Sequence, residues 1–396
     1  MTGAGFPDPA SCMASRAQRT LFSEWWWTVD RPLLAALAAL VLIGLVLTLA
    51  ASPPVAIRLG ADPFHFVNRH ALYLVPALAT LLATSLMTPR QVRRVALVVF
   101  VIGVTLCIAT LYVGPEIKGA RRWLSLFGVS VQPSEFMKPA FVVLAAWAFA
   151  ESVRRPEMPA RLIAFGLLGA ATLPLVYQPD IGQTVLLALV WCALFFLAGL
   201  RWLWLAGLGS AAIAGLGAAY FFVPHVTARI KRFLDPGSGD TFQIDTALES
   251  FMRGGWLGRG PGEGTVKRIL PDGHADFVFA VAAEEFGIVL CLILVVLFAF
   301  IVLRALAHAM REEDAFGRFA VAGLSLLFGL QAAIAMAVNL HLMPAKGMTL
   351  PFISYGGSSM ISLAYGMGML IALTRRRPRA EAMAELEHAA ARGARA

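Results

Sequence analysis

Four short polar segments of this 396-residue chain combine residue types that bind anions and transfer protons. Together they contain the candidate site residues Arg121, Arg122, Glu135, Lys138, Asp180, His274, Asp276 and Lys346. Arginine binds phosphate oxygens through paired hydrogen bonds, and such contacts strengthen where water is scarce. A carboxylate beside these cations can accept a proton from a hydroxyl group. The pattern therefore predicts a site for a phosphorylated substrate.

Asp276 is the candidate general base. It lies where an apolar stretch begins, next to Phe277 and close to Phe279 and Val281. An ionisable side chain at membrane depth indicates a functional site, because burying a charge there is costly. The structural alternative is that Asp276 caps the N-terminus of the helix that follows.

Several other polar residues have structural interpretations that need no chemistry. Ser134 and Asp180 are candidate N-caps of the helices that follow them. Glu284 and Glu285 lie about two helical turns further into the chain, where we expect a structural polar network. The small residues at 356–359 favour close packing of one helix against another.

The elements that must position these residues are membrane-spanning helices. Hydrophobic residues make up 59% of the chain and charged residues 14%, and the mean hydropathy is +0.73. A water-soluble domain does not carry such a composition, so the chain needs lipid as its solvent. About ten apolar stretches approach the roughly 20 residues that a helix needs to cross the bilayer, which predicts an all-α integral membrane protein. They lie near 33–52, 67–87, 91–113, 137–153, 161–177, 181–199, 202–223, 276–304, 317–340 and 352–374.

The distribution of arginine predicts the orientation of the chain. Short arginine-rich loops at 90–94, 154–161 and 304–318 mark the cytoplasmic side, so both termini are expected inside. The first apolar stretch follows a Trp-rich interface anchor and is read as a retained span, not a cleaved signal. The expected organisation is a cytoplasmic tail at 1–32, a transmembrane domain at 33–374 with a long periplasmic loop at 224–275 between spans 7 and 8, and a second tail at 375–396.

Two of the expected outer loops are unusually basic. The first carries Lys118, Arg121 and Arg122 beside apolar residues, which is typical of an interfacial segment that faces an anionic lipid headgroup. The second is the loop at 224–275, for which the alternative is that long translocated loops escape the charge rule. The chain has 4 cysteines, and their spacing indicates neither a disulfide framework nor a metal cluster.

Five motifs in the polar segments closely resemble the SEDS family (shape, elongation, division and sporulation). They are GARRW at 119–123, QPSEFMK at 132–138, QPDIGQ at 178–183, LPDGHADFVFAVAAEEFG at 270–287 and PAKGMTLPFISYGGSS at 344–359. With the pattern of spans, the resemblance covers residues 25–375. Lys346 and the WWWTVDRP segment at 25–32 favour the cell-division branch of the family over the elongation branch.

The resemblance implies a peptidoglycan glycosyltransferase. Such an enzyme polymerises lipid II, a disaccharide peptide carried on undecaprenyl pyrophosphate, at the periplasmic face of the inner membrane, here at the division septum. The family's essential aspartate corresponds to Asp276, which is expected to activate the acceptor 4-hydroxyl while undecaprenyl pyrophosphate leaves. The other seven candidate residues are expected as substrate contacts. Ala275, Asp272 and Gly237 depart from the residues usual in the family, which affects the positioning of the long loop and not the proposed base.

The resemblance also implies partners. A class B penicillin-binding protein, which crosslinks the strands, and other division proteins are expected to bind, and no nucleic acid is. Because no residues have the spacing of metal ligands, any Mg²⁺ or Mn²⁺ is expected to bind through the substrate's phosphates. Two other functions stay open at this point: a lipid II flippase, and a non-catalytic scaffold of the division machinery. A transporter would carry polar groups near the membrane midplane, whereas the polar residues here gather at the outer surface.

Overall fold

The structure is a computed structural model of a helical bundle. It describes residues 21–117, 119–126, 129–155, 157–199, 202–222, 227, 231, 242–344 and 347–375. Each predicted apolar stretch contains a long helix: α3 (Arg31–Arg58), α4 (His65–Ser85), α5 (Pro89–Val113), α6 (Pro133–Arg154), α7 (Ala160–Tyr177), α8 (Ile181–Leu197), α9 (Trp202–Phe222), α12 (Val278–Arg311), α13 (Ala315–Asn339) and α14 (Gly357–Thr374). Of the described helices, 8 are long and apolar enough to span a membrane, and α8 is a shorter apolar helix. The predicted fold class is confirmed.

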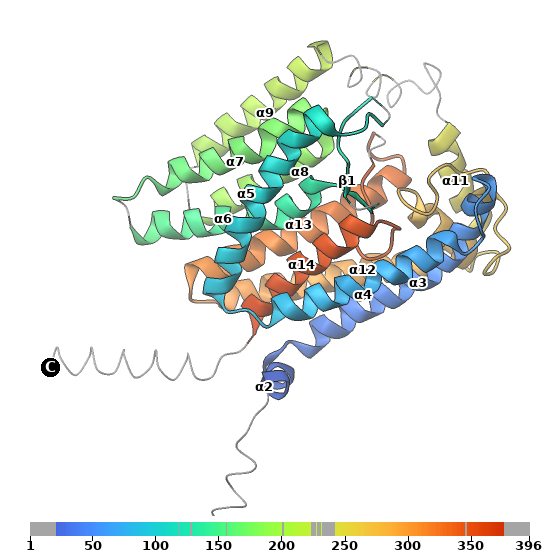
Figure 1. Ribbon diagram of the computed structural model, residues 1–396, viewed down its shortest axis with the longest axis horizontal. Coiled ribbons are helices and arrows are strands. Elements are labelled where there is room, and N and C mark those ends of the chain that lie inside the picture. The colour runs from blue at the N-terminus through green and yellow to red at the C-terminus, as the bar shows by residue number, and fades with distance from the viewer. Residues whose placement is uncertain are drawn as a thin grey trace, which may run out of the picture.

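The arginine-rich connections gather at one end of the bundle, which we call the arginine-rich end. The short helix α2 (Leu21–Thr28) lies there, and Arg375 Nε donates to Thr28 Oγ1 over 3.0 Å. The loops before α3 and α13 are tied to α12 and α6 by ion pairs, Arg304 with Asp30 and Arg154 with Asp314. Figure 1 shows α2 at this end and α11 (Phe242–Gly254) at the other. The two ends of the described chain therefore share one side, as the charge pattern predicts.

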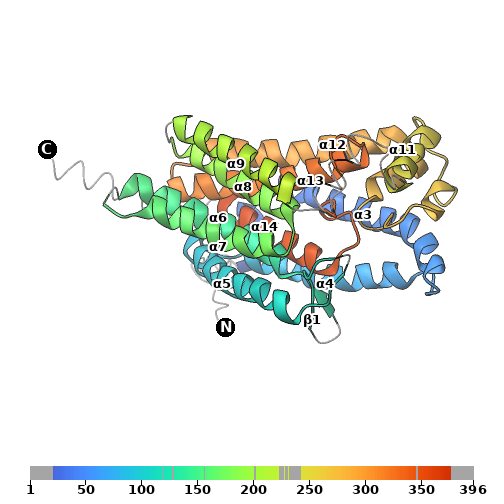
Figure 2. The same ribbon diagram turned by 90° about the horizontal axis from the view of Figure 1, so that it is seen from above.

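The opposite end, which we call the motif end, contains more regular structure than the sequence indicates. Strands β1 (Leu124–Leu126) and β2 (Val129–Val131) pair antiparallel, with Leu124 opposite Val131. The long loop contains α11 and a short 3₁₀ turn, η2 (Val266–Arg268). Figure 2 shows α11 beside one end of α12, close to α3.

The centre of the bundle is formed by α6, α13 and α14. In the apolar stretch of each of these helices, 72%, 67% and 83% of the residues are buried, against 17% for α4 and 28% for α5. Small residues permit close contact between α14 and α4, because a Cβ on Gly357 would lie only 2.7 Å from the ring of Tyr73. The predicted packing role of the segment 356–359 is confirmed for this glycine.

Helix α12 is broken at Gly287, whose φ of 78° and ψ of −178° are not helical. With 34 residues, α12 extends beyond the predicted span, and the part after the break is about 36 Å long, enough to cross the bilayer alone. Backbone groups of the long loop replace the hydrogen bonds that the break removes. These bonds are Arg259 N to Glu284 O (3.0 Å), Gly260 N to Glu285 O (3.0 Å), Ile288 N to Gly255 O (3.0 Å) and Val289 N to Trp256 O (3.2 Å). The loop is thus fixed to the helix that follows Asp276.

Candidate active site

The four polar segments are gathered at the motif end by hydrogen bonds between segments far apart in the sequence. The contacts are Arg122 Nε to Gln178 O (3.2 Å), Gln132 N to Ser358 Oγ (3.4 Å) and Tyr355 N to His274 O (2.9 Å). Each bond joins a different pair of segments. The fold therefore brings all four into one region.

Asp276 lies in this region, half-buried and two residues before α12. Phe277, not Asp276, occupies the N-cap position of α12, and Phe277 makes no side-chain cap bond. Asn339 of α13 holds the backbone instead: its Nδ2 donates to Asp276 O over 2.8 Å, and its Oδ1 accepts from Ala280 N over 3.1 Å. On another side, a Cβ on Gly347 would lie 3.2 Å from Asp276 Oδ2.

The residues before Asp276 are held by the segment that precedes α14. Ser354 Oγ donates to Ala275 O over 2.6 Å and accepts from Leu350 N over 2.8 Å. The ring of His274 lies 4.6 Å from Phe66 and 5.4 Å from Tyr355, measured between ring centroids. The carboxylate of Asp276 therefore projects from a backbone that is fixed on both sides.

Burial among aromatic rings lowers the pKa of His274 below its ordinary value of 6.5. The charge of Asp272 raises this pKa and that of Arg58 lowers it, each with a smaller effect than burial. The buried Nδ1 of His274 has no hydrogen-bond partner within the described chain. Its imidazole is accordingly neutral near pH 7. The predicted role of His274 as a substrate contact stays a prediction.

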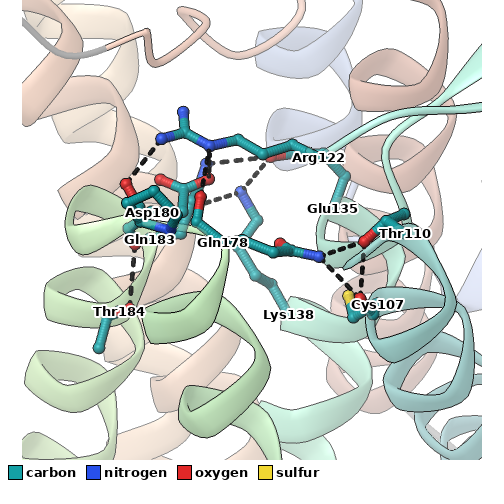
Figure 3. Close-up of polar contacts among 10 residues, drawn as sticks. Cys107, Thr110, Arg122, Glu135, Lys138, Gln178, Asp180, Gln183 and Thr184 are labelled. Carbon is teal, nitrogen blue, oxygen red and sulfur yellow. Dashed lines mark hydrogen bonds and ion pairs between the residues drawn. The ribbon is translucent and has the colours of Figure 1, made fainter. Parts of the chain in front are cut away.

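A second polar group lies inside the bundle, next to these segments. Lys138 Nζ donates to Glu135 Oε1 (2.8 Å), Gln183 Oε1 (3.0 Å) and Gln331 Oε1 (3.2 Å), and its side chain is only 2% exposed. The four residues come from α6, α8 and α13, and Figure 3 shows part of this network. A buried charge needs such compensation, because the loss of its hydration is otherwise prohibitive. In this structure Lys138 therefore binds protein groups and is not presented to solvent.

The buried network reaches the segment beside Asp276. Gln331 Nε2 donates to Thr349 O over 3.3 Å, and Thr349 lies two residues after Gly347. A cavity of about 20 Å³ adjoins Glu135, Lys138 and Gln331, which is room for one water molecule. Glu135 Oε2 is buried with no partner among the described groups, so a water there would satisfy it.

Arg122 ties the β1–β2 region to the turn between α7 and α8. Its Nη2 donates to Pro179 O over 2.7 Å, and its Nε lies 3.7 Å from Asp180 Oδ2 (Figure 3). Burial raises the pKa of Asp180 above its ordinary value, while the charges of Arg122 and Lys138 lower it. Asp180 occupies the N-cap position of α8 as predicted, although its side chain makes no cap bond.

Two other residues singled out from the sequence, Arg121 and Ser134, form no bond to this network within the described chain. Arg121 is exposed and pairs with Glu116 over 3.7 Å at the rim. Lys346 and Lys118 lie outside the described residues. Ser134 is not an N-cap: Gln132 occupies the N-cap position of α6, and the buried Ser134 Oγ has no hydrogen-bond partner in the described part of the chain.

The predicted polar network at Glu284 and Glu285 is confirmed. The carboxylate of Glu284 is fully buried and accepts hydrogen bonds from the backbone N–H groups of Thr265 (2.6 Å), Val266 (2.7 Å) and Lys267 (2.9 Å). Glu285 forms a buried ion pair with Lys267, whose Nζ also donates to Ala50 O of α3 over 3.0 Å. The two carboxylates thus fix the end of the long loop that leads to Asp276.

A family model described as "Cell cycle protein", covering FtsW, RodA and SpoVE, matches residues 31–378. The chain belongs to this family. A probable peptidoglycan glycosyltransferase FtsW from Caulobacter vibrioides is 48% identical over 365 residues, which cover 92% of this chain and 94% of the relative. Another, from Hydrogenovibrio crunogenus, is 33% identical over 357 residues, which cover 87% and 91%. The predicted family and its cell-division branch are confirmed.

Solved structures of the FtsW/RodA/SpoVE family share this fold. A chain from a structure entitled "Structural coordination of polymerization and crosslinking by a peptidoglycan synthase complex" matches with a TM-score of 0.72 and 27% identity, covering 87% of this chain and 97% of that one. The crystal structure of Thermus thermophilus rod shape determining protein RodA matches with a TM-score of 0.63 and 26% identity, covering 88% and 97%.

The site of this family member includes three residues that sequence reasoning missed. Gln183 lies within the QPDIGQ motif, and Gln331 and Asn339 are polar residues in the otherwise apolar helix α13. An amide side chain in an apolar span needs a hydrogen-bond partner, and that requirement is the signal that could have identified them. The described residues contain no group of three or more His, Cys, Asp or Glu side chains that could hold a metal ion.

Proposed function

We propose that this chain is a peptidoglycan glycosyltransferase of cell division that polymerises lipid II, with Asp276 as the general base. The observation that carries the proposal is the placement of Asp276: a half-buried carboxylate on a fixed backbone, at the end of the bundle where the polar motifs meet. The FtsW relatives support the reaction and the division role. A multi-pass location in the inner membrane, with the motif end facing the periplasm at the septum, completes the proposal.

In the proposed reaction, Asp276 accepts the proton of the 4-hydroxyl on the N-acetylglucosamine of an incoming lipid II. The oxygen attacks the anomeric carbon of the growing strand, and the bond from that carbon to the pyrophosphate oxygen breaks. The electron pair leaves with undecaprenyl pyrophosphate. Because the oxygen attacks in line with the breaking bond, the anomeric centre inverts, and an α-linked donor gives a β-glycosidic bond. A well-placed general base of this kind contributes roughly 10²–10⁴ to the rate.

The cationic residues stabilise the leaving pyrophosphate in this scheme. Arg121 is exposed at the rim and is suited to direct contact with the pyrophosphate. Lys346 directly precedes Gly347 in the PAKG motif. Arg122 and Lys138 are bound to protein carboxylates, so they act by positioning the segments and by their field. Any Mg²⁺ or Mn²⁺ would bind through the pyrophosphate and would add to the same stabilisation.

A partner that crosslinks the strands is part of the proposal. The matched synthase complex combines polymerisation with crosslinking according to its title, which supports a class B penicillin-binding protein as the partner here. Other division proteins are proposed to join it.

The test is polymerisation of purified lipid II by the detergent-solubilised protein, with and without the transpeptidase. Asp276→Asn keeps the shape of the side chain and removes its basicity, so we expect no glycan strands while lipid II binding persists. Asp62→Asn is the matched control, because Asp62 also lies at the motif end and, within the described chain, its Oδ1 accepts a local bond from Phe64 N over 2.8 Å. Near-normal polymerisation by Asp276→Asn would remove this residue from the mechanism.

A further inference from the structure

A separate cavity of about 370 Å³ lies at the arginine-rich end, beside α2, and none of the polar motif segments lines it. It is lined by the α2–α3 junction, the last turns of α12 and the end of α14. The lining residues that carry the argument are Trp27, Asp30, Arg31, Arg304, His308 and Arg311. The reaction proposed above uses none of them.

The charges that line this cavity leave an excess of positive charge. Asp30 accepts from Leu33 N over 3.0 Å, receives two hydrogen bonds from Arg304 Nε at 2.8 and 3.0 Å, and contacts His308. Its charge is therefore compensated by its neighbours. Arg31 and Arg311 form no ion pair with any described residue, so they remain able to bind an anion.

The cavity opens beside aromatic residues of the kind that lie at a membrane surface. Helix α2 exposes Phe22, Trp26 and Trp27, the last at 71% of its surface. The guanidinium of Arg31 lies 4.8 Å from the ring centre of Trp27 and 5.6 Å from that of Trp26, which holds it at the cavity. Tryptophan side chains collect at the boundary between headgroups and hydrocarbon. The cavity is therefore at headgroup depth.

An apolar track leads from the cavity along α12. Ala307 lines the cavity, and Leu303 and Phe300 lie one and two turns further from its mouth on the same face of the helix. Leu303 is 66% exposed and Phe300 is 40% exposed. An acyl chain attached to a headgroup in the cavity would run along these side chains, so both parts of a lipid molecule find a complementary surface.

We propose that this cavity binds the phosphate of an anionic phospholipid, whose acyl chains lie along α12. Arginine suits the role because its planar guanidinium forms paired hydrogen bonds with phosphate oxygens. Basic pockets between spanning helices are known to accept the headgroups of acidic lipids. The bound lipid would link α2 and α3 to α12, and it would do so independently of the polymerisation site.

The test is a lipid titration of the full chain, delipidated in neutral detergent and followed by native mass spectrometry. Wild type is expected to bind dioleoylphosphatidylglycerol more tightly than dioleoylphosphatidylcholine. The double variant Arg31→Gln/Arg311→Gln should weaken phosphatidylglycerol binding about 30-fold, since each arginine near an anionic lipid contributes roughly fivefold, and should weaken phosphatidylcholine binding less, because that lipid shares the phosphate but carries no net charge. Arg161→Gln is the matched control, because this exposed arginine lies outside the cavity, and it should bind as wild type does.

A second variant separates a specific cavity from general surface charge. Ala307→Trp fills the cavity and keeps every arginine, so it should also weaken phosphatidylglycerol binding. Wild-type affinity in Ala307→Trp or in the double variant would overturn the proposal. If millimolar inorganic phosphate displaced phosphatidylglycerol from the wild-type protein, the cavity would be a site for free phosphate. That result would likewise overturn the assignment to a lipid.

Discussion

Gly347 lies against the carboxylate of Asp276 so closely that a Cβ at this position would be 3.2 Å from Asp276 Oδ2. The two residues are 71 positions apart in the sequence, and the contact joins the PAKG motif to the segment before α12. Any residue with a side chain at position 347 would require the carboxylate of Asp276 to shift, whereas glycine does not. The glycine thus defines one wall of the space around the proposed base.

Gly347→Ala should reduce the rate of polymerisation by about tenfold, because small displacements of a catalytic group carry large rate penalties. The added methyl group requires a shift of a few tenths of an ångström, and the fold should persist. The measurement is kcat for lipid II polymerisation together with the midpoint of thermal unfolding. Gly166→Ala is the control, since a Cβ there meets open space. An unchanged kcat in Gly347→Ala would show that this contact does not position Asp276.

Lys138→Met should lower the free energy of unfolding by about 3 kcal/mol, because removal of one partner leaves the other charge buried and unpaired. Glu135→Leu/Lys138→Met removes both charges and should recover part of that loss. Both variants are measured by unfolding in mixed micelles. At the C-cap of the same helix, the exposed Arg155 lies 3.6 Å from the largely buried Glu151, and solvent screens its charge, so Arg155→Met should cost less than about 1 kcal/mol. Equal losses in Lys138→Met and Arg155→Met would contradict the importance of the buried pair.

Glu284→Gln should loosen the end of the long loop. The wild-type carboxylate accepts three backbone hydrogen bonds, and each bond to a charged group contributes about 1.5–3 kcal/mol. The amide presents one oxygen and a donor group, so amide hydrogens at 265–267 should exchange at least about tenfold faster. Hydrogen exchange with mass spectrometry measures this directly. Glu263→Gln, at an exposed position of the same loop, should leave the exchange rates unchanged.

His274 predicts a dependence of stability on pH. Its pKa is lowered in the folded protein by burial, so the unfolded chain binds more protons at mildly acidic pH. The contribution of neutral His274 is complete above pH 6.5 and declines as the pH falls below that value toward the folded pKa. His274→Phe keeps the aromatic packing and cannot be protonated, so its unfolding temperature should fall less between pH 7 and pH 5 than that of wild type. Identical pH profiles would show that burial of His274 is not linked to stability.

Much of the fold was determined by the sequence itself. All ten predicted apolar stretches contain helices, because a chain in hydrocarbon must satisfy its backbone hydrogen bonds within each segment. The orientation signal is local as well, so arginines in short loops predicted which connections lie at the same end of the bundle. The motif residues around Asp276 were also identified from sequence, since their types are distinctive wherever they lie.

Only the tertiary structure decided how these residues are used. Arg121 and Arg122 are neighbours in sequence, yet Arg121 is exposed at the rim and Arg122 pairs with Asp180. Lys138 is buried because Gln331, 193 positions away, helps to satisfy it.

The break of α12 at Gly287 also depends on the tertiary structure. The backbone groups that replace its lost hydrogen bonds come from the loop at 255–260. Helix formation depends on neighbours along the chain, whereas the partner of a polar group depends on which segments pack together. That packing is a property of the whole fold, and it determined which cations are bound by the protein and which face outward.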